Sequence, residues 1–174
     1  MKSEYCVREL QQGDSDRIFN LAMESWKYTY KNIFSEDFIE SYVNRAYRKE
    51  SLENIFSFAK QGLTKFFVLL ERKSETVSGF AQIGYDRFWE SGEKTLPLRL
   101  FRIYLNPQIL GGGLGTLLLK KVEEFVRQEQ QISYIVGVHE RNTIGLRFYE
   151  KMGFKTTTIE SDAEGEIYFE KMID

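Results

Sequence analysis

The strongest chemical signal in the chain is a glycine cluster, in which four of the five residues from 111 to 115 are glycine. Glycine loses more conformational freedom on folding than any other residue, so the cluster indicates positive φ angles or a close approach to the backbone. The first amides of a helix lack intrahelical partners and carry about half a positive charge, which suits a phosphate group. The cluster therefore predicts either a phosphate-binding loop or a tight turn between a strand and a helix.

Two common phosphate-binding patterns do not fit the residues around the cluster. A Walker loop ends in Gly-Lys-Ser/Thr, but Gly115 is followed directly by Thr116. A dinucleotide-binding fingerprint would need glycine at position 116 and a place in the first strand–helix–strand unit of the chain. The remaining pattern is a loop for the pyrophosphate of an acyl-CoA.

The elements that must position this loop follow from the apolar periodicity. We expect a strand over 4–10, then a helix that begins at Gly13-Asp14-Ser15, a second capped by Ser35 and a third that ends at Gly62. Three strands over 66–70, 77–85 and 96–105 come next, the first two of them antiparallel. A helix from about Gly113, a strand over 134–138, a helix over 142–152 and a hairpin of 154–160 with 166–172 complete the order. This order predicts a mixed α/β sheet with helices packed on it, in a single domain over 1–174.

Composition narrows the function classes. The 24 basic and 26 acidic side chains nearly balance and give a net charge of −2, so no basic excess indicates nucleic acid as a partner. No apolar run approaches the roughly 18 residues of a membrane span, and the N-terminal residues lack the apolar stretch of a signal peptide. We expect a cytoplasmic protein without a membrane partner. One cysteine and one histidine exclude an internal disulfide and a histidine-rich zinc site.

Three stretches resemble a known family. "RIYLNPQILGGGLGTLLL" and "VGVHERNTIGLRFYEKMGF" look like the two signature blocks of the GNAT N-acetyltransferases, and the order of strands and helices matches that family. "ESWKYTYKNIFSEDFIESYVNRAYRKESLENIF" is similar to the N-terminal helical region of the PaiA-type polyamine acetyltransferases. The resemblance implies a mostly antiparallel sheet with helices on both faces. It also implies acetyl-CoA as donor and a small-molecule primary amine as acceptor. A homodimer is a further expectation for the chain.

The resemblance assigns the cofactor-binding residues. The pyrophosphate motif falls on Leu110 to Gly115, with Leu110 in place of a polar or cationic side chain. The backbone amides from Gly111 to Thr116 still supply donors. The strand residues Tyr104 and Leu105 would pair their main chain with the pantetheine arm. The expected cofactor-binding set is Tyr104, Leu105, Gly111, Gly112, Gly113, Leu114, Gly115, Thr116, Asn142 and Lys151.

Tyr149 is the expected catalytic residue. The family pattern places it near the thioester sulfur, where its phenol could protonate the departing thiolate, since ordinary pKa values of about 10 and about 8.5 are close enough for proton transfer. The same pattern places Asn142 on the cofactor arm. The residue types alone allow plainer roles, with Asn142 as a helix N-cap and Tyr149 as a core aromatic.

The general base is not determined by the sequence. Many relatives place a glutamate on the strand before the glycine loop, whereas this chain has Arg99. Glu24, Asp86, Glu90, His139 and a chain of waters remain as alternatives. His139 has a suitable pKa range but could equally be an ordinary strand residue.

The acceptor side depends on the first helix and the segment after it. Glu24, Trp26 and Tyr30 could form an aromatic and acidic groove that attracts a cationic amine, most simply a polyamine such as spermidine or spermine. The competing interpretation is an amphipathic core helix. A protein lysine, an N-terminal amine or another small amine also remain as alternative acceptors, and a non-catalytic acyl-CoA sensor is the alternative outside the enzyme class.

Overall fold

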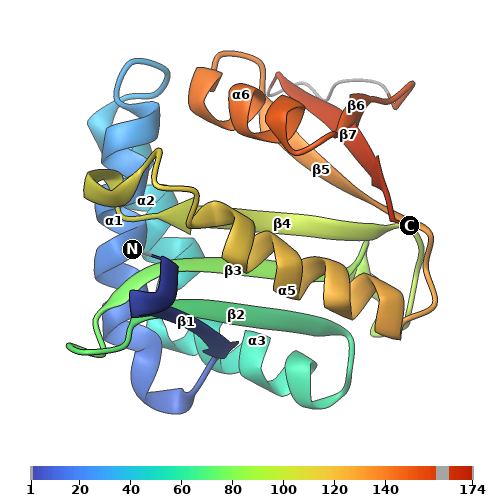
Figure 1. Cartoon of the computed structure of the whole chain (residues 1–174), viewed down its shortest axis with the longest axis horizontal. Coiled ribbons are helices and arrows are strands. Elements are labelled where there is room, and N and C mark those ends of the chain that lie inside the picture. Colours follow the sequence, from blue (N-terminus) through green and yellow to red (C-terminus); the bar gives the residue numbers. More distant parts are fainter. Residues whose placement is uncertain (1, 160–164, 174) are drawn as a thin grey trace.

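The computed structural model describes residues 2–159 and 165–173. Within them, seven strands form one sheet with the order β1-β2-β3-β4-β5-β7-β6 (Figure 1). The strands are β1 (Tyr5–Glu9), β2 (Thr64–Glu71), β3 (Val77–Tyr85), β4 (Leu98–Leu105), β5 (Ser133–His139), β6 (Lys155–Thr156) and β7 (Glu166–Met172). All neighbours pair antiparallel except β4 and β5, so the predicted mixed and mostly antiparallel sheet is confirmed.

The parallel contact between β4 and β5 is short. Only Arg99 with Ile135 and Leu100 with Val136 pair across it in the described part of the chain. Beyond these pairs the two strands diverge, which Figure 1 shows as β5 rising away from β4. The far half of β4 stays paired with β3, where Phe80 faces Tyr104. Among the described residues, the outer edge of β4 that faces β5 is therefore left without a partner strand.

Helices cover both faces of the sheet, as predicted. On one face lie α1 (Ser15–Tyr30), α2 (Glu36–Tyr47) and α3 (Lys49–Lys60), and on the other lie α5 (Gly115–Gln128) and α6 (Thr143–Lys151). Successive side chains of β2 point to opposite faces of the sheet. Phe66, Val68 and Leu70 belong to the core with α1, α2 and α3, whereas Phe67 and Leu69 belong to the core with α5.

Two helix ends follow from the residues that the sequence indicated, whereas the predicted cap of the first helix does not form. Ser35 accepts the N–H of Phe38 at the start of α2, and Gly62, with φ of 73°, ends α3. The side chain of Asp14 does not cap α1. It is buried and accepts hydrogen bonds from the Gln11 amide and from the Arg8 guanidinium, which ties β1 to the first helix.

Several element boundaries differ from the sequence-based prediction. The third predicted strand begins at Leu98 rather than Leu96, and the main helix begins at Gly115 rather than near Gly113. The C-terminal hairpin forms, but its first strand is only Lys155–Thr156, and its expected end at Glu160 lies outside the described residues. No sequence pattern indicated the short α4 (Phe88–Ser91) or the 3₁₀ turns η1 (Lys2–Glu4), η2 (Gln12–Asp14) and η3 (Pro107–Ile109). No helix among the described residues is long and apolar enough to cross a membrane.

Candidate active site

A cavity of about 330 Å³ opens where β4 and β5 separate. Its walls come from the end of α1, the outer half of β4, the glycine loop, β5 and α6. Nine of the ten residues expected to bind the cofactor line it, and Gly112 is the exception. These nine are Tyr104, Leu105, Gly111, Gly113, Leu114, Gly115, Thr116, Asn142 and Lys151. Residues from separate parts of the sequence thus meet at the place where the sheet is open.

The glycine loop forms the cavity wall at the start of α5. Gly111 and Gly113 have φ angles of 81° and 71°, which residues other than glycine rarely adopt. Gly115 serves packing instead, because a Cβ there would lie 2.9 Å from the Phe148 ring of α6. The two interpretations left open by the sequence, a turn and an anion site, are thus compatible in this loop.

The same loop offers free hydrogen-bond donors. Within residues 2–159 and 165–173, the backbone N–H groups of Gly111, Gly113, Leu114 and Gly115 have no protein acceptor. Leu114 and Gly115 stand at the first turn of α5, where the helix dipole adds positive charge. This donor set suits a pyrophosphate, and the side chains of Arg147 and Lys151 at the cavity wall add cations.

Lys2 is a cation at this loop that the sequence did not reveal. Its Nζ lies 3.3 Å from the Thr116 hydroxyl, and a Cβ built on Gly113 would lie 3.3 Å from the same nitrogen. Leu110, where the motif has a polar or cationic residue, is 37% exposed. The N-terminal turn η1 thus brings a positive charge to a loop whose own motif lacks one. No local pattern could have indicated this, because 114 residues separate Lys2 from Thr116.

The unpaired edge of β4 supplies the middle of the site. Tyr104 and Leu105 line the cavity, and the Ser25 hydroxyl of α1 donates a 2.9 Å hydrogen bond to the Leu105 carbonyl. This bond fixes the edge strand against the first helix. Main-chain groups of an open strand edge are suited to pair with an extended ligand that carries amides, as pantetheine does.

A chain of polar side chains connects three elements at the cavity. Asn142 caps α6 by accepting the N–H of Gly145, and its Nδ2 donates to the Tyr30 hydroxyl at 3.3 Å. The Tyr30 and Tyr104 hydroxyls lie 3.5 Å apart. Burial raises the pKa of both tyrosines, so each stays a neutral hydrogen-bond donor. Asn142 therefore has a clear structural role, and its contact with a cofactor stays a prediction.

Tyr149 lies in the cavity wall on α6 and is 6% exposed. Its ring packs edge-on against Phe148 and Phe154. Burial raises its pKa well above the ordinary value of about 10, and the negative charge of Glu166 acts in the same direction. The phenol thus stays protonated at every pH at which an enzyme works. The raised pKa makes it a weaker acid than an ordinary phenol, so proton transfer to a thiolate is less favourable than the ordinary pKa implied, while the hydroxyl can still donate a hydrogen bond to a developing thiolate.

A charged cluster that the sequence did not predict lies beside the cavity. Glu166 of β7 accepts hydrogen bonds from Arg99 Nη2 at 2.7 Å and from the Tyr168 hydroxyl at 2.8 Å. Asp86 adds a second carboxylate 3.8 Å from Arg99. Burial alone would lower the pKa of Arg99, but these anionic partners outweigh it and raise the pKa. The available signal was Gly137, because a glycine inside a strand often marks a close approach.

The four side chains expected as candidates for the base lie in different surroundings. Glu24 and Glu90 are exposed and do not line the cavity, and Asp86 is paired with Arg99. His139 packs edge-on against Phe34, and its Nδ1 accepts the Arg141 N–H at 3.1 Å. A neutral imidazole in this arrangement carries its proton on Nε2, so no lone pair is left for the amine proton.

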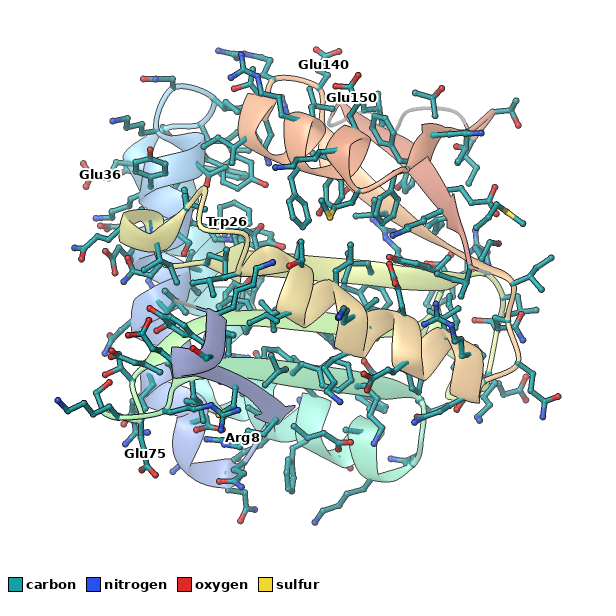
Figure 2. All side chains as sticks on the ribbon, in the orientation of Figure 1. Arg8, Trp26, Glu36, Glu75, Glu140 and Glu150 are labelled. Atoms are coloured by element: carbon teal, nitrogen blue, oxygen red, sulfur yellow. The ribbon has the colours of Figure 1, made fainter. Side chains whose placement is uncertain are left out.

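Two of the three residues expected on the acceptor side contact each other, since the ring centroids of Trp26 and Tyr30 lie 4.4 Å apart. Tyr30 lines the cavity, but Trp26 is 6% exposed and stacks on Tyr42 at 4.1 Å between ring centroids. Figure 2 shows Trp26 among the side chains of the interior. Glu24 is exposed, with an Asn106 amide 3.4 Å from its Oε2. Trp26 thus follows the core-helix interpretation, and of the three only Tyr30 reaches the cavity.

Comparison with known proteins identifies the family to which this chain is similar. Residues 17–154 match the acetyltransferase (GNAT) family. The chain is 31% identical over 149 residues to a spermidine N(1)-acetyltransferase of Thermoplasma acidophilum, an alignment that covers 86% of this chain and 87% of the relative. It is 29% identical over 144 residues to the uncharacterized N-acetyltransferase YuaI of Bacillus subtilis, with 83% and 76% coverage.

A solved structure supports the same assignment. The PaiA N-acetyltransferase of Thermoplasma acidophilum in complex with coenzyme A is 28% identical to this chain and has a TM-score of 0.82, over 97% of this chain and 99% of the other. The free amides of the glycine loop, the neighbouring cations and the open edge of β4 fit the phosphates and amides of that cofactor class. The chain belongs to the GNAT family and is an N-acetyltransferase whose donor is acetyl-CoA.

Proposed function

We propose that this enzyme transfers the acetyl group to a primary amine of a polyamine such as spermidine or spermine. The observation that carries this proposal is the likeness to the Thermoplasma spermidine N(1)-acetyltransferase over 86% of the chain. The structural likeness to the PaiA protein extends over 97% of the chain and so includes the N-terminal helices α1 and α2. Two carboxylates, Glu166 and Asp86, lie against the Arg99 guanidinium beside Gly137 of the cavity wall, and this local balance favours a cationic substrate.

In the proposed mechanism, the cofactor is held by its phosphates and its arm. The amides of the glycine loop and the Lys2 ammonium would hold the pyrophosphate, while the β4 edge at Tyr104 and Leu105 would pair with the pantetheine amides. Such an arrangement would place the thioester at the opening between β4 and β5. The binding of the cofactor and the orientation of its thioester would thus be fixed before the amine binds.

Tyr149 acts on the leaving group. When the amine nitrogen attacks the acetyl carbon, a C–N bond forms, the C–S bond breaks and the electron pair remains on sulfur. The Tyr149 hydroxyl donates its proton toward that sulfur. Because burial keeps the phenol protonated, this donor is available throughout the neutral and mildly alkaline range.

The acceptor can be identified by measuring thiol release from acetyl-CoA with a panel of amines. The panel contains spermidine, spermine, a lysine peptide, a peptide with a free N-terminus and an aminoglycoside. We expect the two polyamines to have the highest kcat/KM. A preference for a peptide would replace the polyamine by a protein acceptor, and cofactor binding without turnover of any amine would support a sensor.

A further inference from the structure

We propose that Glu166 is the carboxylate that receives the acceptor amine, binding its ammonium group beside the thioester and taking up the proton that it loses. This inference rests on the proposed amine acetylation and names a catalytic residue for it. Three observations carry it: the position of the carboxylate over Gly137, the groups that hold it there, and its electrostatic effect on two tyrosines of the cavity.

The position of the carboxylate follows from Gly137. This glycine of β5 lines the cavity, and a Cβ built on it would lie 2.6 Å from both carboxylate oxygens of Glu166. The carboxylate therefore lies directly over the glycine backbone, in the space that any other residue would fill. Gly137 stands just beyond Val136, the last residue of β5 that pairs with β4 in the described chain. Glu166 thus reaches the opening between the two strands.

Two side chains hold the carboxylate from opposite sides of the opening. Arg99 reaches Oε2 from β4, and the Tyr168 hydroxyl reaches the same oxygen from β7. The Arg99 guanidinium also lies 5.2 Å from the centre of the Tyr168 ring, so both partners form one packed unit. We assign Arg99 and Tyr168 as positioning residues, because they fix the carboxylate while the amine approaches it.

The surrounding charges favour an ammonium ion. Among the described residues, the titratable groups around Glu166 include Arg99 on β4, Asp86 just after β3, Tyr168 on its own strand, His139 opposite it on β5, and Tyr30 and Tyr149 across the cavity. The guanidinium of Arg99 is shared between the carboxylates of Glu166 and Asp86. The negative charge of Glu166 contributes to the raised pKa of both Tyr30 and Tyr149, which places it within electrostatic reach of the two phenols.

The proton balance is complete without any other reactant. The ammonium group transfers one proton to the Glu166 carboxylate, which passes it to solvent, and the neutral nitrogen then attacks the acetyl carbon. The second proton leaves nitrogen as the amide forms and returns through solvent to Tyr149, which gives its own proton to sulfur. Each acetyl transfer therefore yields one amide, one thiol and one proton in water.

The test compares Glu166→Gln with two control variants over a range of pH. We expect Glu166→Gln to lower kcat/KM for spermidine by about 100-fold or more near neutral pH, with the KM for acetyl-CoA unchanged. The deficit should shrink toward about pH 10, where an alkylamine is substantially neutral without a base. This pH dependence separates a proton acceptor from a group that only supports the fold.

The two controls are Glu150→Gln and His139→Gln. Glu150 is exposed on α6 and labelled in Figure 2, so removal of its charge should leave the rate and its pH dependence unchanged. His139 stands opposite Glu166 on β5. His139→Gln should keep the pH profile of the parent enzyme, because the lone pair of its Nδ1 already accepts the Arg141 N–H.

A second variant keeps the inference falsifiable if Glu166→Gln folds poorly. Glu166→Asp keeps a carboxylate on β7 that can pair with Arg99, so this variant should keep more activity than Glu166→Gln. A deficit that is equal at every pH and matched by a lower Tm would show a purely structural ion pair and overturn the proposal. Unchanged kcat/KM in Glu166→Gln would overturn it as well. Absence of amine turnover by the parent enzyme would instead refute the proposed function.

Discussion

Lys2 provides a quantitative test of how the cofactor phosphates are bound. Replacing Lys2 by Met keeps the length of the side chain and removes the charge that lies 3.3 Å from Thr116 Oγ1 at the glycine loop. The residue is exposed, so the attraction of its ammonium group for a phosphate is worth about 1 kcal/mol rather than the larger value of a buried pair, or about a 5-fold change in Kd. Leu110→Arg should restore this loss, because it supplies a cation from the motif position itself.

The assay is calorimetric titration of coenzyme A into four proteins: the parent, Lys2→Met, Leu110→Arg and the double variant. We expect the Kd to rise about 5-fold in Lys2→Met and to return toward the parent value in the double variant. The difference should fade at high salt, because exposed charges are screened. An unchanged Kd in Lys2→Met, or a loss that Leu110→Arg does not restore, would refute the reasoning.

Three further predictions concern the loop, the fold and the opening of the sheet. Gly113→Val should abolish coenzyme A binding in a titration while circular dichroism shows a folded protein, because the φ of 71° and the approaching phosphate both exclude a branched side chain. Asp14→Asn should lower the free energy of unfolding by about 1 to 3 kcal/mol at pH 7. Burial opposes ionisation of Asp14, but the Arg8 and Gln11 hydrogen bonds outweigh it and lower its pKa. In denaturant titrations the difference from the parent should therefore shrink as pH falls below about 4 and vanish below the lowered pKa. Gly137→Ala should displace the Glu166 carboxylate and lower kcat/KM for spermidine, measured by thiol release, without changing the KM for acetyl-CoA.

The periodic parts of the fold were predictable from sequence because each reflects a local rule. Strand β2 alternates between two cores and could be identified by its period, and Ser35 and Gly62 mark helix ends through their own chemistry. The ends of the strands were harder to predict from sequence. Leu96 and Pro97 precede β4 although the apolar run includes them, because proline has no N–H to give to the sheet.

The parts of the site that could not be predicted from sequence depend on contacts between distant segments. Lys2 reaches Thr116 across 114 residues, and Arg99 reaches Glu166 across 67. Neither pair forms a motif, because the fold rather than the local spacing brings them together. Trp26 shows the converse, since its type suggested a binding groove, but its neighbours on α1 and α2 enclose it in the core.

The most direct test of the central claim compares the parent enzyme with Tyr149→Phe in thiol release with spermidine and acetyl-CoA. The substitution keeps the ring that packs against Phe148 and Phe154 and removes only the hydroxyl. We predict turnover by the parent, a fall in kcat by about 100-fold or more in the variant, and the same Kd for coenzyme A in both. Equal kcat in the two proteins would remove Tyr149 from the mechanism, and a parent enzyme that acetylates no amine would contradict the assignment of this cavity as the active site.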